Sequence, residues 1–74
     1  MPTQEDINSW ISQLSDHNDA AGRSQSNRNL QECLVNEECV KEFGSQIEDA
    51  YDDLGLTADQ VERLPVDFNN GKDD

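Results

Sequence analysis

Apolar residues recur at helical spacing in several parts of this 74-residue chain, and no segment alternates apolar and polar residues as a strand would. The first group places four apolar residues at i, i+3, i+4 and i+7, on one face of a helix: Ile7, Trp10, Ile11 and Leu14. Thr3 can cap this helix, and Asp6 stands at the position of a capping-box partner. We therefore predict a helix over residues 3–15. Trp10 is then expected in the core, and the alternative is that it is a hot spot for a partner.

The segment that follows Asn36 has the most regular apolar pattern in the chain. Its apolar residues form one stripe at the 3.6-residue repeat: Val40, Phe43, Ile47, Ala50, Tyr51 and Leu54. Asn36 is a suitable N-terminal cap and Gly55 a suitable C-terminal cap, so we predict a helix over residues 37–54. Gly44 lies at the edge of the stripe, where glycine costs helix stability, and we expect another helix to cross close above it.

Two shorter helices and one linker complete the secondary-structure prediction. The sequence NLQECLV predicts a short helix over residues 29–35, and a capping-box sequence that starts at Thr57 predicts another over residues 57–64. Residues 16–28 lack apolar periodicity, so we interpret them as a flexible polar linker. His17, the only histidine, is then expected to be a solvated loop residue.

The fold class predicted from these elements is all-α, a small bundle of about four short helices. One domain over residues 1–64 would include the linker, and residues 65–74 would form an acidic, disordered tail. No apolar run approaches the length of a membrane span, and no signal-peptide pattern follows Met1. We therefore expect a soluble, cytoplasmic protein that does not contact a membrane.

The two cysteines lie six positions apart, at the ends of the sequence CLVNEEC. Within one continuous helix, Cys33 and Cys39 would be about 9 Å apart along the axis, too far for a disulfide. A break at Asn36 would let two helices meet at a corner and bring the sulfur atoms together. Three states stay open: buried thiols, which we favour, a structural disulfide, and a redox pair.

Acidic residues dominate the charge of the chain. Seventeen acidic residues against five basic ones give a formal net charge of −12. Residues 1–29 hold four acidic and two basic residues, a net charge of −2, and residues 30–74 hold thirteen and three, a net charge of −10. Nucleic acids and anionic lipids would repel such a chain, so the expected partner is a larger protein with a basic surface. The same composition also suits life in high salt.

Carboxylates line the side of the predicted 37–54 helix that lies opposite its apolar stripe. Residues at i, i+4, i+7, i+11 and i+14 share this side: Glu38, Glu42, Ser45, Asp49 and Asp52, with Glu48 and Asp53 beside them. The helix rises about 21 Å over this span, so the carboxylates follow one another somewhat as phosphates do along a nucleic-acid strand. Like charges at i, i+4 destabilise a helix, which favours a recognition role over an ordinary solvated face. We predict that six carboxylates bind the partner, and we call them the acidic face: Glu38, Glu42, Glu48, Asp49, Asp52 and Asp53.

The sequence contains little that could support catalysis. Two cysteines cannot form an all-cysteine zinc site, and no second histidine is available. There is no glycine-rich phosphate loop, and we expect too few core residues to build an apolar pocket around a carboxylate. We therefore predict a protein that is not an enzyme and that holds neither a metal nor a cofactor.

Residues 34–64, LVNEECVKEFGSQIEDAYDDLGLTADQVERL, resemble the small helical module of LigA-type dioxygenase subunits, which is also similar to the leader regions of borosin precursors. The shared pattern places an aromatic residue, Phe43, about a dozen residues before Gly-Leu-Thr at 55–57, with an apolar residue at Leu64. The predicted helix over residues 3–15 has no counterpart in that pattern. The resemblance implies a helical recognition module that a larger enzyme binds, without catalysis of its own.

These observations lead to one preferred hypothesis and two alternatives. The preferred function is a non-enzymatic, acidic regulatory protein that docks on a basic groove of a larger protein, as an inhibitor that mimics nucleic acid would. In the first alternative, the chain is a precursor or a leader-type recognition module for a peptide-modifying enzyme. In the second, it is a salt-adapted small domain whose charge has no specific target.

Overall fold

The computed structural model describes residues 1–63, which form four α-helices without a strand among them. α1 spans Gln4–Gln13, α2 spans Ala20–Leu34, α3 spans Glu37–Leu54 and α4 spans Ala58–Glu62. The predicted all-α fold class is therefore confirmed. The predicted tail over residues 65–74 lies outside the described residues, as does the last residue of the predicted 57–64 helix.

Side-chain caps fix where the helices begin. In the capping box of α1, the backbone N–H of Asp6 donates to Thr3 Oγ1 and the backbone N–H of Thr3 donates to the Asp6 carboxylate. Thr57 and Gln60 form the same pair of hydrogen bonds at the start of α4. The side chain of Asn36 accepts a hydrogen bond from the first turn of α3. All three predicted caps are confirmed.

The two glycines of the α3 region have different roles: Gly55 requires an unusual backbone conformation, and Gly44 lies where a side chain would meet a neighbouring residue. Gly55 has a φ of 71°, in the left-handed region that glycine adopts without strain, and its N–H donates to the carbonyls of Tyr51 and Asp52. A Cβ on Gly44 would lie 2.7 Å from a methyl group of Val40 on the same helix, and no other described helix comes within 4 Å of that position. The expected crossing of another helix above Gly44 is therefore wrong.

α2 is the element that departs most from the prediction. It begins at Ala20 rather than at residue 29, so most of the predicted linker over residues 16–28 is helical. Asp19 caps it by accepting a hydrogen bond from the Gly22 N–H at 2.9 Å. Its buried residues follow the helical repeat, but the first three are polar: Arg23, Ser26, Asn27, Leu30 and Cys33. A search for apolar periodicity does not detect such a face.

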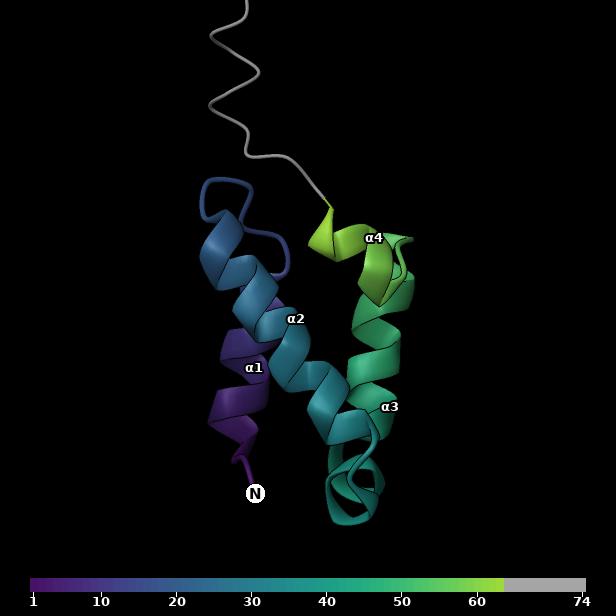
Figure 1. Cartoon of the computed structure of the whole chain (residues 1–74). Helices are drawn as coiled ribbons and strands as arrows, with labels where there is room; N and C mark the ends of the chain where they lie inside the picture. The colour runs from purple at the N-terminus through teal and green to yellow at the C-terminus, as the bar shows by residue number, and fades with distance from the viewer. Residues whose placement is uncertain (64–74) are drawn as a thin grey trace, which may run out of the picture.

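α2 contacts each of the other three helices. Figure 1 shows it running obliquely between α1 and α3, from the upper part of the bundle to the lower end of α3. The helices share one apolar core: Ile7, Leu14, Leu30, Cys33, Cys39, Phe43, Ile47 and Val61. Trp10 packs against this core but stays partly exposed, so its predicted place in the core holds only in part.

A disulfide joins Cys33, near the end of α2, to Cys39, in the first turn of α3. The two Cα atoms lie 5.1 Å apart. The break at Asn36 makes this possible, because it turns the chain and removes the separation that a continuous helix would impose. The favoured prediction of two buried thiols is therefore wrong, and the structural disulfide is confirmed.

Candidate functional site

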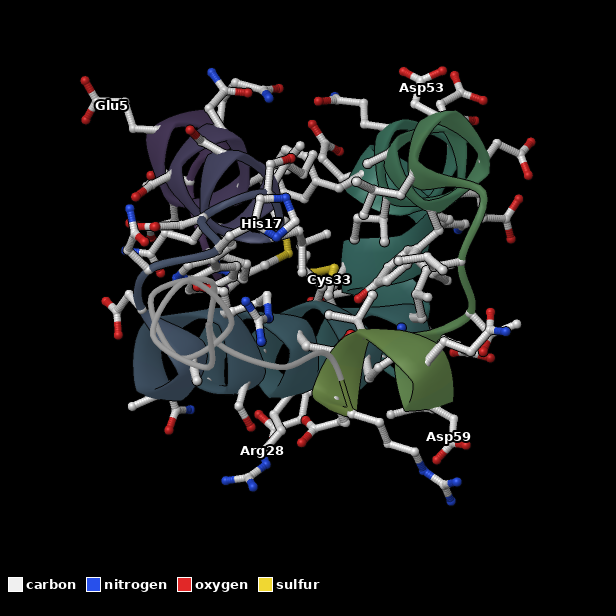
Figure 2. The ribbon with its side chains drawn as sticks, turned by 90° about the horizontal axis from the view of Figure 1, so that it is seen from above. Glu5, His17, Arg28, Cys33, Asp53 and Asp59 are labelled. Atoms are coloured by element: carbon white, nitrogen blue, oxygen red, sulfur yellow. A yellow bond between two sulfur atoms is a disulfide. The ribbon has the colours of Figure 1, made fainter. Side chains whose placement is uncertain are left out.

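The six carboxylates of the acidic face are all exposed on α3. They lie opposite the residues through which α3 is buried: Cys39, Phe43, Gly44 and Ile47. Figure 2 shows Asp53 pointing away from the other helices, while Arg28 and Asp59 point outward on the side of α2 and α4. The predicted partner-binding residues therefore share the solvent side of one helix.

The charge of the acidic face is not compensated within the described part of the chain. None of its carboxylates forms a hydrogen bond or an ion pair with another described residue. The two ion pairs of residues 1–63 lie elsewhere, between Arg28 and Glu62 at 3.7 Å and between Arg63 and Asp59 at 3.4 Å. Lys41, the basic residue of α3, is exposed as well. The acidic face is thus available to a cationic partner.

A second group of polar side chains joins α2, α3 and α4. Asn27, buried on α2, donates through Nδ2 to the carbonyl oxygen of Ala58 and to Glu62, both at 3.1 Å. Its amide oxygen accepts a hydrogen bond from the hydroxyl of Tyr51. The hydroxyl of Ser24 donates to the other carboxylate oxygen of Glu62 at 2.8 Å. These contacts tie the short helix α4 to the bundle.

Two residues of this group have shifted pKa values. Hydrogen bonds from Asn27 and Ser24, and then the charge of Arg28, hold the pKa of the Glu62 carboxyl below its ordinary value. Burial raises the pKa of the Tyr51 hydroxyl, and the nearby charge of Glu62 acts in the same direction. Neither residue lines the pocket described next.

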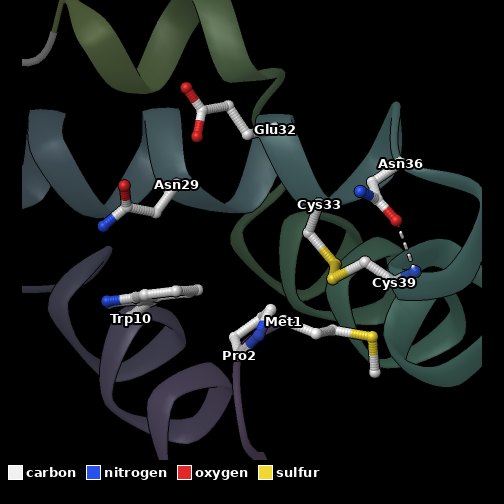
Figure 3. A pocket seen from close by; sticks show the side chains of 8 residues that line it. All are labelled: Met1, Pro2, Trp10, Asn29, Glu32, Cys33, Asn36 and Cys39. Atoms are coloured by element: carbon white, nitrogen blue, oxygen red, sulfur yellow. Dashed lines mark hydrogen bonds between the residues drawn. A yellow bond between two sulfur atoms is a disulfide. The ribbon is translucent and has the colours of Figure 1, made fainter.

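A pocket of about 170 Å³ opens where the start of α1 meets the corner between α2 and α3 (Figure 3). Eight residues line it: Met1, Pro2, Trp10, Asn29, Glu32, Cys33, Asn36 and Cys39. Glu32 supplies a carboxylate to this lining, but it is exposed, so the pocket does not enclose that carboxylate in apolar surroundings. Its walls come from two segments that are distant in the sequence, residues 1–10 and residues 29–39, so no local pattern predicts it.

Residues 1–63 contain no group of three or more His, Cys, Asp or Glu side chains placed to hold a metal ion. His17 is exposed in the turn between α1 and α2, as predicted, although that turn is shorter than the predicted linker. In the same part of the chain, no helix is both long enough and apolar enough to pass through a membrane.

Comparison with protein families, curated proteins and solved structures finds no significant match to this chain. The resemblance of residues 34–64 to LigA-type and borosin-leader modules therefore stays a prediction. A function for the chain has to be inferred from its own residues and their geometry.

Proposed function

We propose that this chain is a non-enzymatic binding protein that docks its acidic face in a basic groove of a larger, nucleic-acid-handling protein, and so inhibits or regulates it. The observation that carries the proposal is the acidic face itself. Six carboxylates stand exposed along one helix, and no described cation pairs with them. Charged surfaces of this kind attract a partner of opposite sign and raise its rate of association.

The spacing of the charges supports mimicry of a nucleic-acid strand. From Glu38 to Asp53, α3 rises about 22 Å, which gives one carboxylate for every 4–5 Å or so of helix axis. One strand of B-DNA carries a phosphate about every 3.4 Å. Lysine and arginine side chains arranged for phosphates could therefore meet carboxylates at a similar spacing and form charge-assisted hydrogen bonds with them.

The position of the charges along α3 also supports a role outside folding. Asp52 and Asp53 lie in the last turn, where the helix dipole disfavours a negative charge by about 0.3–1 kcal/mol at an exposed site. The last turn has no basic residue to offset them. Glu38 and Glu42 add repulsion at i, i+4. These charges lower the stability of α3, which is consistent with a surface that a partner binds.

The test is to neutralise three members of the acidic face together, as Glu42→Gln, Asp49→Asn and Asp52→Asn. The wild-type protein is used to capture its partner from the native cell, and binding to the purified partner is then measured at increasing salt. We expect the triple variant to lose binding, and wild-type binding to weaken steeply with salt, because exposed charge pairs are screened beyond about 8–10 Å. Circular dichroism of the variant should show unchanged helix content.

A matched control separates the acidic face from net charge. The control variant removes an equal number of negative charges from exposed positions outside α3: Glu5→Gln, Asp16→Asn and Asp59→Asn. It should leave binding nearly unchanged. Binding that ignores salt but disappears on removal of residues 65–74 would contradict the proposal and favour the leader-type alternative. Structural disulfides are rare in cytosolic proteins, so each measurement is made with oxidised and with reduced protein.

A further inference from the structure

The pocket beside the disulfide has an aromatic surface supplied by Trp10. This side chain packs against the core, yet part of it remains exposed and lines the pocket. In Figure 3 the indole is seen edge-on, and Asn29 and Glu32 project from α2 on one side of its plane. Tryptophan is the aromatic residue whose ring face attracts cations most strongly.

Glu32 is the negative group of this pocket. It is exposed, and it forms no hydrogen bond or ion pair with any other described residue. The amide oxygen of Asn36 is already an acceptor for the N–H of Cys39, and that of Asn29 accepts from Gln25 at 3.1 Å. The carboxylate of Glu32 is therefore the acceptor in this pocket that the described residues leave unused.

The remaining residues that line the pocket are apolar, and the disulfide fixes two of them relative to each other. Pro2, the side chain of Met1 and the disulfide close one side of it. Cys33 follows Glu32 directly in the sequence, so the bond from Cys33 to Cys39 also fixes the end of α2 that carries the carboxylate. The volume of about 170 Å³ exceeds the roughly 150 Å³ of a cavity that accepts benzene, so a planar group of similar size fits.

We propose that this pocket binds the guanidinium group of an arginine side chain, stacked on Trp10 and paired with Glu32. The inference rests on the proposed function, because the arginine is supplied by the same basic partner that the acidic face binds. A guanidinium group is planar and weakly hydrated, so it stacks on an aromatic ring while its N–H groups donate to a carboxylate. A neutral apolar group would instead cover the carboxylate of Glu32 without compensating its charge.

The pocket can be tested without the partner, because Trp10 is the only tryptophan and its fluorescence reports on this site. The oxidised wild-type protein is titrated with butylguanidinium, with butylammonium, and with butylurea, which has the shape of the first probe without its charge. We expect a saturable change for butylguanidinium with a Kd on the order of millimolar, and binding of the other two that is weaker by about fivefold or more.

Glu32→Gln tests the role of the carboxylate at an exposed position where folding is not at risk. This variant should bind butylguanidinium about fivefold more weakly or worse, while Glu5→Gln, with the same change in net charge at an exposed position outside both the pocket and the acidic face, should bind it as the wild type does. Trp10→Phe keeps an aromatic ring, and titration followed by the NMR signals of the Asn29 and Asn36 amides should show weakened binding.

Three results would overturn the inference: no saturable change with butylguanidinium, equal binding of butylurea, or unchanged binding in Glu32→Gln. Equal or tighter binding of butylammonium would overturn the assignment to arginine. None of these outcomes depends on the acidic face. Conversely, the triple variant on α3 tests the proposed function without altering a residue that lines the pocket. The two experiments therefore show separately whether the acidic face binds the partner and whether the pocket binds a guanidinium group.

Discussion

Asn27 is a buried amide whose hydrogen bonds hold three helices together. Asn27→Ala removes these bonds and leaves the Tyr51 hydroxyl and the Ala58 carbonyl without their partner. Tyr51 and Ala58 are only partly buried, and a typical hydrogen bond contributes about 0.5–1.5 kcal/mol, so we expect the free energy of unfolding to fall by about 1–3 kcal/mol. Urea denaturation followed by circular dichroism measures it. Asn8→Ala is the control, because Asn8 is exposed and bonds only to Gln4.

Glu62 should make the attachment of α4 sensitive to acid. Its pKa is lowered in the folded protein by hydrogen bonds from Asn27 and Ser24, so it stabilises the fold above the unfolded-state pKa and loses this effect as pH falls through the folded-state pKa. Glu62→Gln should therefore be less stable than the wild type at pH 7, and the difference should shrink as the pH falls through the folded-state pKa of Glu62.

Urea denaturation of both proteins across this pH range checks the prediction for Glu62. Glu48→Gln serves as the control, because Glu48 is exposed and forms no hydrogen bond or ion pair with a described residue. Any change in stability that this variant shows comes from net charge rather than from a lost contact. A difference between wild type and Glu62→Gln that grew on acidification would contradict the assigned sign.

At the scale of single elements, helices that bury apolar residues could be predicted. Of α2, the part that buries apolar residues was predicted as a helix over residues 29–35, and the part that buries polar ones was not. The bounds of α3 follow from its apolar stripe and its caps, because the stripe residues Phe43 and Ile47 are buried and its other four are partly buried. In α2 the buried positions 23, 26 and 27 hold polar side chains. Their hydrogen-bond partners come from the turn between α1 and α2, from α1 and from α4, so their burial depends on tertiary structure. The Asp19 cap was the one local signal available.

The two candidate sites also differ in whether they depend on one helix or on how several helices pack. The acidic face lies on a single helix, so the helical repeat was enough to place its six carboxylates on one side. The pocket needs Trp10 from α1, Glu32 from α2 and the disulfide to α3 at one point. That meeting depends on how the helices cross, and the spacing of residues along the chain does not determine it.

The disulfide should contribute measurably to stability, because it closes a short loop across the corner between α2 and α3. Loop-closure entropy for a loop of this length is worth about 2–3 kcal/mol. Reduction should therefore lower the Tm and the free energy of unfolding of the wild type by that amount. A Cys33→Ser/Cys39→Ser variant should have the lower stability already and should not respond to reductant.

Mass spectrometry after alkylation without reductant should find no free thiol, and two labelled cysteines would contradict the structure.

For the whole molecule, a high net charge has to be reconciled with a small core. The described residues bury eight apolar side chains, whereas the chain carries a net charge of −12. Self-repulsion at that charge destabilises a compact state, and a chain of this length has little buried surface to offset it. The disulfide and the polar network around Asn27 supply stabilisation that does not depend on a larger core.

This balance predicts how stability depends on salt. The free energy of unfolding should rise as NaCl increases from about 10 mM to about 150 mM and then level off, because the Debye length shrinks from about 30 Å to about 8 Å. The triple variant Glu42→Gln/Asp49→Asn/Asp52→Asn should start more stable at low salt and gain less, since part of the repulsion has been removed. Urea denaturation at each salt concentration measures both. A wild-type protein that is unfolded at about 10 mM NaCl and folds only near molar salt would contradict a recognition role for the charge and favour the salt-adapted alternative.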